Sequence, residues 1–315
     1  MHRLVVFLHT SSALSFFAEK NYPEPARLFN DIVGPYRMPF LMFMSGMFLH
    51  RSLNESVGAN IRGKFDLIFW PFLIWSLVVY AAEGRLTLEY VLKTPISAPS
   101  LLWYLWFLTA YYLLALLADR LRLSFLVLAA VFLAASSVAP GGLRIDRFCF
   151  LFAFFLLGHV AVIREVKDRV TLPLALVGLV AALAGSWISV RFGTSKYDPL
   201  YAWAPLGLIA FVLYISRFYH ESALTRPFEW IGRNSIVFYV AHFPVLVFLA
   251  RKVFFQSPIS SGLLYAILFL VTLLAASLLQ AARSRSRAVA ALFDFSLLRG
   301  SPRPSPSAQA TSLPK

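Results

Sequence analysis

The first apolar run of the chain, LVVFLHTSSALSFFA (Leu4–Ala18), indicates the fold class, because a helix of this composition belongs in lipid or in a protein interior. His9 interrupts the run. An ionisable side chain at membrane depth is costly unless it faces the inside of a helix bundle or a wet cavity. His9 therefore has two interpretations: it belongs to a functional site, or it bridges two helices as a neutral imidazole.

Hydroxyl side chains follow His9 in the same run. Residues three or four positions apart share one face of a helix, so Ser12 lies beside His9 and Ser15 continues that row. The row predicts either a wet groove or a place where small residues let helices approach closely.

The composition places the whole chain in a membrane. Of its 315 residues, 59% are hydrophobic and 14% are charged, which excludes a water-soluble globule. We expect an all-α polytopic membrane protein with about ten transmembrane helices in one bundle. The apolar runs are Leu4–Ala18, Met38–Leu49, Leu67–Ala82, Leu101–Ala118, Leu123–Ala139, Phe148–Ile163, Leu172–Val190, Tyr201–Ser216, Ile231–Ala250 and Gly262–Ala282.

The distribution of charge predicts the topology. With an even number of helices, the larger share of the 29 Lys and Arg residues lies on the side of both termini, and the C-terminal segment supplies most of this excess. The positive-inside rule then places both termini in the cytoplasm of a multi-pass protein of the inner (plasma) membrane. The loops Glu19–Tyr36 and Arg191–Pro199 are expected to face outward. Anionic lipid headgroups explain the net charge of +14 better than nucleic acid does.

Two segments frame the bundle. Residues 1–282 form the expected transmembrane domain, and residues 283–315 form a basic, then Pro- and Ser-rich cytoplasmic tail, expected to be disordered from about Gly300. The first run is shorter than the roughly 20 residues that cross a bilayer, so we expect the functional protein to begin upstream of Met1. The single cysteine, Cys149, excludes an intramolecular disulfide.

Few ionisable side chains lie inside the apolar runs. They are His9, His159, His242 and, at an edge, Arg233, and no Asp or Glu falls within the runs as bounded above. Proton- or ion-coupled transporters place carboxylates near the middle of the membrane, so this pattern disfavours a pump or symporter. No His, Asp or Glu spacing resembles a zinc site, and no metal is expected.

The second run, RMPFLMFMSGMFLHR, carries features of a distorted helix. Pro39 frees a backbone carbonyl and Gly46 admits close approach, so we expect this helix to be bent or partly unwound beside the cavity. Arg37 is expected at its outer mouth. There it either anchors the helix at the membrane interface or holds an acceptor near His9.

An ordered set of motifs resembles the acyltransferase 3 family of integral membrane acyltransferases. After the histidine of the first run come YRMPFLMFMSG, FWPFLIW, LWYLWFLTAYYL, RFCFLFAFFLLGHV and IGRNSIVFYVAHFPVL, in this order. The resemblance covers residues 1–282 and points to compact members that acylate glucans and other surface sugars. It implies acyl-CoA as co-substrate on the cytoplasmic side, no bound cofactor, a carbohydrate acceptor and a catalytic histidine at His9. The sequence departs from the family pattern at one place. The family has a charged residue well before its histidine, and Arg3 lies too close to His9 to be that residue.

The chemistry of acyl transfer agrees with this resemblance. Moving an acetyl or succinyl group from a thioester to a sugar hydroxyl needs a base, and a histidine with an ordinary pKa of about 6.5 suits that task. His9 is the predicted general base. The developing oxyanion needs donors, for which Arg37, Ser45, Trp106 and backbone amides near Gly46 are candidates.

Basic residues between the second and third runs are candidates for the donor site. Arg51, Arg62 and Lys64 could bind the phosphates of coenzyme A, although every loop on that side is basic.

The later histidines and the start of the ninth run complete the set. His242 either lines the acceptor path or bridges two helices, and His159 is expected at the interface. Asn234 and Ser235 are expected to cap the helix that follows them.

Two other functions fit parts of the pattern. Ten helices and a polar groove would also suit a flippase or permease for a lipid-linked or small glycoside, against which the missing carboxylates and the ordered motifs weigh. The other histidine-dependent family of membrane acyltransferases would need an Asn partner inside the bundle and well upstream of its histidine, and no Asn in the sequence is identified as that partner.

Overall fold

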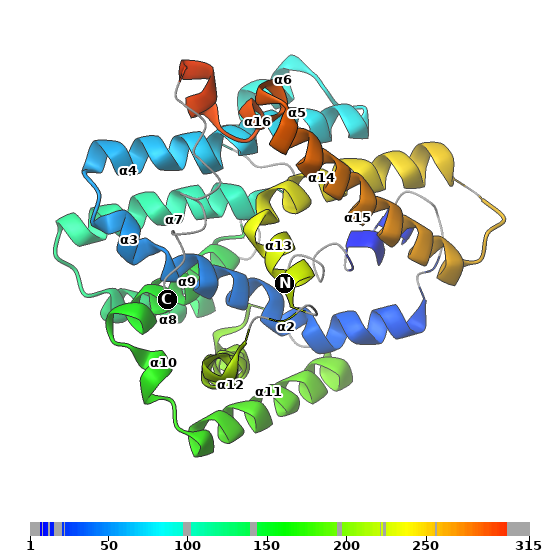
Figure 1. Ribbon diagram of the computed structural model, residues 1–315. Coiled ribbons are helices and arrows are strands. Elements are labelled where there is room, and N and C mark those ends of the chain that lie inside the picture. Colours follow the sequence, from blue (N-terminus) through cyan, green and yellow to red (C-terminus); the bar gives the residue numbers. More distant parts are fainter. Residues whose placement is uncertain are drawn as a thin grey trace.

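The computed structural model describes residues 7, 9–11, 13–15, 21, 23–96, 102–138, 144–193, 197–220, 222, 225–255 and 257–300, and every regular element among them is a helix. In the first helix, residues 7, 9–11 and 13–15 are described. The α-helices that follow, labelled in Figure 1 where there is room, are α2 (Glu24–Met47), α3 (Leu49–Leu53), α4 (Val57–Lys64), α5 (Trp70–Glu83), α6 (Leu88–Lys93), α7 (Trp103–Arg120), α8 (Phe125–Val138), α9 (Ile145–Ile163), α10 (Val166–Arg169), α11 (Leu172–Phe192), α12 (Trp203–Ile215), α13 (Arg226–Arg233), α14 (Ser235–Phe248), α15 (Ser261–Arg285) and α16 (Arg287–Ala291). Short π segments are η1 (Phe65–Phe69) and η5 (Leu249–Val253), and 3-10 segments are η3 (Pro199–Tyr201), η4 (Ser216–Phe218) and η6 (Phe295–Arg299).

Seven helical stretches of the described residues are long and apolar enough to cross a membrane. They are Glu24–Leu53, Val57–Glu83, Ile145–Ile163, Leu172–Phe192, Pro199–Phe218, Ser235–Val253 and Ser261–Arg285. The helix α8 is apolar but shorter, and the first half of α7 is rich in Trp and Tyr rather than aliphatic residues. The all-helical, polytopic architecture is therefore confirmed, whereas the count of ten spans is not.

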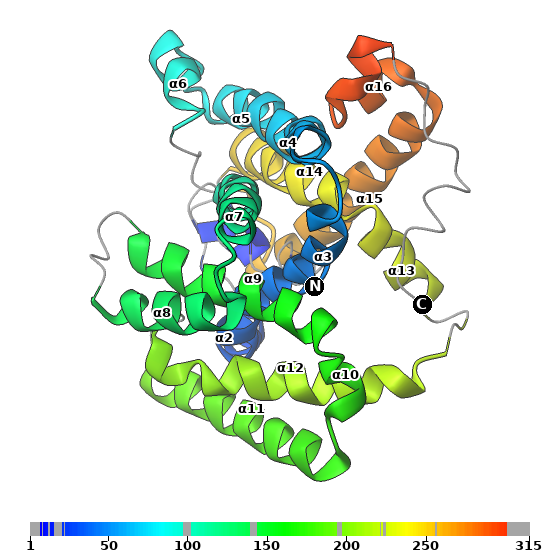
Figure 2. The ribbon, with the colours of Figure 1, turned by 90° about the vertical axis from the view of Figure 1, so that its left-hand side faces the viewer.

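The bundle has two faces that differ in their short elements. At one face Arg251, at the end of α14 and η5, donates a hydrogen bond to the carbonyl of Glu83 at the end of α5, 2.8 Å away, and α6 follows directly. At the other face Arg217 in η4 donates to the carbonyl of Lys167 in α10. We name them the α6 face and the α10 face. Figure 2 shows α6 on the left, and α10, α13 and α16 on the right.

The helix α2 begins at Glu24, which is 14 positions before Met38, where its apolar run begins. The proline at position 35 removes the N–H that would bond the carbonyl of Asp31 within the helix. Ser189 of α11 donates to that carbonyl, with 2.9 Å from Oγ to O, and Ser186 donates to the carbonyl of Ile32 at 3.2 Å. The neighbouring helix thus satisfies the carbonyl that proline frees, and α2 continues as helix through both of its prolines. Most of the predicted outer loop Glu19–Tyr36 is therefore helix.

Two glycines bring α2 and α9 into backbone contact. A Cβ at Gly46 would collide with the carbonyl oxygen of Phe155, and a Cβ at Gly158 would collide with that of Phe43. The close approach predicted for Gly46 is confirmed. Around this crossing, the aromatic side chains of α9 form the centre of the core, where Phe150, Phe152, Phe154 and Phe155 are buried.

The segment after α15 packs back onto the bundle. The indole Nε1 of Trp70 donates to the carbonyl of Ala291 at 2.8 Å, and the buried ring of Phe293 lies 5.3 Å from that of Trp75. Arg299 forms an ion pair with Asp66. Residues 283–300, assigned above to the tail, thus include helices that cover η1 and α5, and residues 301–315 lie outside the described part of the chain.

Asp66 also corrects the inventory of ionisable groups. It lies one position before the third apolar run, but the helical stretch Val57–Glu83 includes it, and only 5% of its surface is exposed. A carboxylate therefore lies within a candidate span. Ion-coupled transport is therefore less strictly disfavoured than the apolar runs indicate, because the helix contains a carboxylate that lies just outside the run.

Candidate active site

His9 lies against α14 in the first helix. Its ring is half-buried and stacks on the ring of His242, with centroids 5.1 Å apart and planes at 29°. The neighbouring part of the first helix is fixed by α14 and α15: Ala13 and Leu14 are buried among apolar residues of those helices, and the Tyr265 hydroxyl donates to the carbonyl of Phe7 at 2.6 Å. The structure thus brings together the two histidines that the sequence placed at its opposite ends, and we call them the histidine pair.

The backbone of α14 fixes the tautomer of His242. Its side chain is fully buried, and Nδ1 lies 3.2 Å from the carbonyl oxygen of Phe238. A carbonyl oxygen can only accept, so Nδ1 carries the proton and Nε2 of the neutral ring carries the lone pair. This Nε2 and the Nδ1 of His9 are both buried, and neither has a hydrogen-bond partner among the described residues.

A polar chain connects the first helix to α2 beside His9. Asn30 donates from Nδ2 to the Ser11 hydroxyl at 3.0 Å, and its Oδ1 accepts from Nη1 of Arg37 at 3.0 Å. All three side chains are buried, and Arg37 acts electrostatically on His9. The position predicted for Arg37, at the mouth of a helix, is wrong: α2 begins at Glu24, so Arg37 lies in its middle and inside the bundle. Ser12 lies outside the described residues.

A row of tyrosines leads away from His242 toward the α10 face. The ring of Tyr239 lies 5.8 Å from His242 and 5.2 Å from the ring of Tyr104. We name Tyr239, Tyr104 and Tyr112 the tyrosine row. None of the three was predicted as a site residue. Tyr104 and Tyr112 lie in LWYLWFLTAYYL, where tyrosines among apolar residues are the sequence feature that could have indicated them.

Ser45 contacts the tyrosine row rather than the histidine pair. Its hydroxyl lies 2.8 Å from that of Tyr104, and its carbonyl accepts from the Tyr112 hydroxyl at 3.2 Å. At the end of the row, Nζ of Lys64 lies 4.1 Å above the ring of Tyr112. The row therefore connects the start of η1 with His242 through hydroxyls and ring faces.

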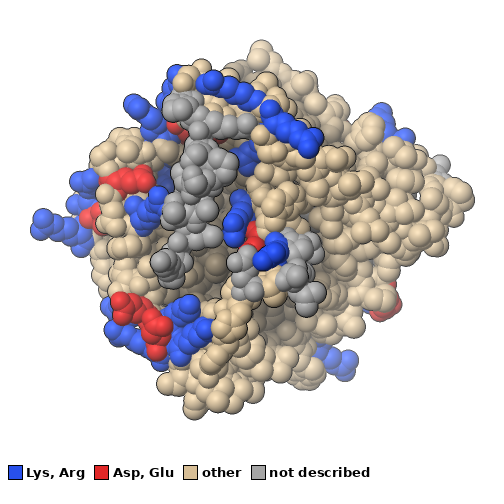
Figure 3. Space-filling view, viewed as in Figure 1, with Lys and Arg blue, Asp and Glu red and all other residues tan. Residues whose placement is uncertain are grey.

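The other basic candidates lie on the surface near Lys64. Arg62 on α4 and Arg51 on α3 are exposed, whereas Lys64 is half-buried. In Figure 3, Lys and Arg gather over the left-hand part of the view, where α3, α4 and α10 lie, and the right-hand part over the ends of α14 and α15 is mostly uncharged. Of the three residues predicted for the donor, Lys64 reaches the tyrosine row.

Two candidates lie away from the histidine pair. The indole Nε1 of Trp106 donates to the carbonyl of Pro95 at 3.1 Å, at the α6 face. His159 is buried near the end of α9, with its ring 4.7 Å from Phe125 and 6.0 Å from His50. Among the residues described, no group of three or more His, Cys, Asp or Glu side chains could hold a metal ion.

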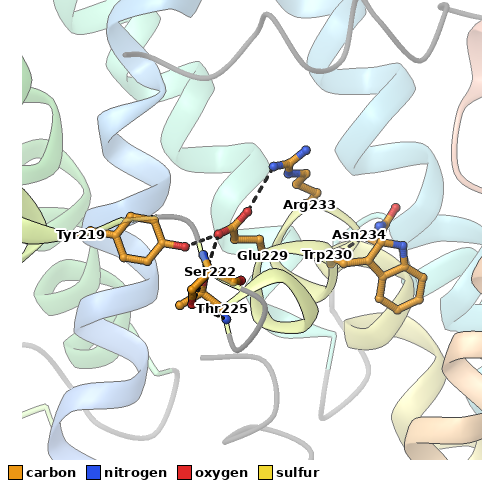
Figure 4. A network of polar contacts seen from close by, with 7 residues as sticks. All are labelled: Tyr219, Ser222, Thr225, Glu229, Trp230, Arg233 and Asn234. Carbon is orange, nitrogen blue, oxygen red and sulfur yellow. Dashed lines mark hydrogen bonds and ion pairs between the residues drawn. The ribbon is translucent and has the colours of Figure 1, made fainter.

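The start of α14 differs from its prediction. Asn234 donates from Nδ2 to the carbonyl of Trp230, 2.8 Å away, and so closes α13 instead of capping α14 with its side chain. Figure 4 shows Glu229 between Tyr219 and Arg233. Its carboxylate accepts from the Tyr219 hydroxyl and from Thr225 at 3.2 Å, and pairs with Arg233 at 3.3 Å.

Comparison with known proteins identifies the family. The model of an acyltransferase domain, that of the acyltransferase 3 family, matches residues 4–281, which is most of the chain. No curated protein and no solved structure shows significant similarity. The match includes the helices that carry the histidine pair, Arg37 and the tyrosine row. The chain therefore belongs to the acyltransferase 3 family and is a multi-pass membrane acyltransferase.

Proposed function

We propose that this membrane acyltransferase moves an acetyl- or succinyl-type group from acyl-CoA to a hydroxyl of a cell-surface or exported carbohydrate, with His9 as general base. The observation that carries the proposal is the histidine pair, in which each ring has a buried nitrogen without a hydrogen-bond partner among the described residues. Most buried polar atoms have a hydrogen-bond partner, and a catalytic role is one recognised reason for an exception. A lone pair on a neutral imidazole is the group that general base catalysis requires.

The reaction can be written with the residues present. As the sugar hydroxyl attacks the thioester carbonyl, His9 takes its proton; the carbon–sulfur bond then breaks, and the resulting imidazolium protonates the departing thiolate of coenzyme A. We assign stabilisation of the oxyanion between these steps to Arg37, which acts electrostatically on His9. His242 offers its Nε2 as a hydrogen-bond acceptor for the carbohydrate.

The two faces suggest separate routes for the substrates. Lys64 and the tyrosine row lead from the α10 face to His242, and Arg51 and Arg62 lie on the surface near the start of that route. Phosphates of coenzyme A bind well to such basic groups. We assign the donor to this route and the acceptor to the α6 face.

The test is acyl transfer by the purified full-length protein with acyl-CoA and a gluco-oligosaccharide. His9→Ala should lower kcat by about 10²–10⁴-fold, because removing a general base costs that much. His159→Ala is the matched control, since it removes another buried histidine that lies away from the pair. Near-normal kcat in His9→Ala would remove His9 from the mechanism. Movement of a glycoside across the membrane without release of coenzyme A would favour a flippase.

A further inference from the structure

Arg147, in the first turn of α9, lies between two aromatic rings. The guanidinium carbon is 5.1 Å from the ring centroid of Trp103 at the start of α7, and 4.5 Å from that of Tyr197 just before η3. Its Nε is buried and has no hydrogen-bond partner in the described structure. A guanidinium held by ring faces keeps its N–H donors in one plane, directed to the edge.

The surroundings of Tyr197 are positively charged. Arg37, Arg144 and Arg147 all act electrostatically on Tyr197, whereas Asp146 is the acid that acts on it. No ion pair among the described residues involves Arg144 or Arg147. Packing against rings explains why Arg147 is held there, but Asp146 is a single acid beside three arginines, so the cluster keeps an excess of positive charge.

The cluster lies at the α6 face, to which the acceptor is assigned above. The starts of α7 and α9 and the segment before α12 all belong to that face, because Trp106 in the first turn of α7 bonds the segment after α6. Arg37 lies deeper in the bundle, and its charge acts on both Tyr197 and His9. Lys64 and the donor route lie at the opposite end of the bundle.

We propose that Arg147 and Arg144, with Tyr197, form a binding site for an anionic group, carboxylate or phosphate, on the carbohydrate acceptor. The proposal rests on the proposed acyl transfer and names the class of its acceptor. Arginine binds carboxylate and phosphate oxygens through two parallel N–H donors, which fixes orientation as well as position. An acceptor held this way at the α6 face presents its hydroxyl toward Arg37 and His9.

The experiment compares three acceptors with the full-length protein in nanodiscs of phosphatidylcholine: a gluco-oligosaccharide, the same oligosaccharide with one glucuronate unit, and glucose 6-phosphate. Arg147→Met should raise the KM of the anionic acceptors about tenfold or more, as expected for a lost hydrogen bond to a charged group, and leave the neutral acceptor and kcat unchanged. Arg147→Lys should restore part of the loss. Arg191→Met is the control, because Arg191 is an exposed arginine at the end of α11.

Binding is measured separately from turnover. The His9→Ala protein, titrated with the glucuronate oligosaccharide, should bind it in an Arg147-dependent way. If acyl transfer occurs but Arg147→Met affects neutral and anionic acceptors equally, the anionic site is wrong and the acyltransferase proposal stands. If the glucuronate oligosaccharide binds but no sugar is acylated, the proposed reaction fails and the site stands. If phosphatidylglycerol raises the Tm through Arg147 and no acceptor binds, the site is one for lipid headgroups and the inference is overturned.

Discussion

At the scale of single residues, the candidate site depends on the stacked rings of His9 and His242, whose buried nitrogens have no hydrogen-bond partner among the described residues. The sequence selected His9 and His242 because imidazoles are costly in apolar runs, but nothing in it shows that their rings stack. The sequence predicts Arg37 at the mouth of its helix, because the apolar run is shorter than the helix α2. The tyrosine row was missed because tyrosine among apolar residues also suits the interfacial belt of a membrane helix.

Lys64 separates donor binding from catalysis at the residue scale. Lys64→Met should raise the KM of acyl-CoA about tenfold with little change in kcat, because a contact to a donor phosphate contributes equally to the ground and transition states. Steady-state kinetics with acyl-CoA varied at a fixed concentration of sugar measures both constants. Arg62→Ala should act in the same direction.

Arg169→Met is the control for Lys64, because Arg169 is an exposed basic residue of α10 on the same face. An equal rise in KM in the control would assign the effect to the general charge of the face. A fall in kcat with unchanged KM in Lys64→Met would instead move Lys64 into the catalytic step.

At the scale of elements, the sequence predicted that helices exist but misplaced their ends. The helix α2 extends back to Glu24, because serines of the neighbouring helix α11 bond carbonyls beside its first proline, and α15 extends to Arg285. The hydrogen bond from Ser189 to the carbonyl of Asp31 is one such case. These hydrogen bonds join residues that are far apart in the sequence, so a hydropathy window of neighbouring residues cannot predict them.

The crossing of α2 and α9 makes a prediction about stability. Gly46→Ala should lower the Tm, because the new Cβ collides with the carbonyl of Phe155, and overpacking costs roughly 1–3 kcal/mol. Gly63→Ala is the matched control: nothing lies within 4 Å of its Cβ position, so the better helix propensity of alanine should leave the Tm unchanged or raise it. Thermal unfolding of both variants in detergent checks this, and an unchanged Tm in Gly46→Ala would contradict the close contact.

The network around Glu229 predicts a dependence on pH. Its pKa lies below the ordinary value of 4.5, first because the Tyr219 hydroxyl donates to the carboxylate. A depressed pKa means that the carboxylate stabilises the fold at pH values above 4.5 and that this contribution is lost as the pH falls through the lowered pKa. We expect α13 to loosen in acid.

A spin label at His220→Cys, in a Cys149→Ala background, measures this loosening. The label should be more mobile at a pH below the lowered pKa of Glu229 than at about pH 6, and Glu229→Gln should be mobile at both, since it lacks the charge. Equal mobility of the parent protein at both pH values would contradict the role of Glu229.

At the scale of the whole molecule, composition predicted an all-α membrane protein and the ordered motifs predicted its family, and both are confirmed. The number of spans is harder to obtain, because aromatic residues in α7 and the short length of α8 leave these helices near the limit of what hydropathy resolves. The cluster around Arg147 was not predicted, since its residues come from three separate segments.

The topology of the bundle stays a prediction with a direct test. We expect the α10 face to be cytoplasmic. In a Cys149→Ala background, an impermeant thiol reagent added to intact cells should label Leu88→Cys on α6, and Leu121→Cys at the end of α7 only after permeabilisation; both positions are exposed. The reverse pattern would invert the orientation and move the donor route to the outer side.

The ion pair between Asp66 and Arg299 bears on biosynthesis. The two residues are 233 positions apart, and a ribosome makes the chain from its N-terminus, so the helix with Asp66 is complete long before Arg299 exists. Until the last part of the chain is made, the buried carboxylate of Asp66 lacks the guanidinium of Arg299. A premature stop codon between α15 and Arg299 would leave Asp66 without this partner permanently. Such a product would hold every candidate catalytic residue, but its buried, unpaired carboxylate would make it a substrate for the cell's proteases.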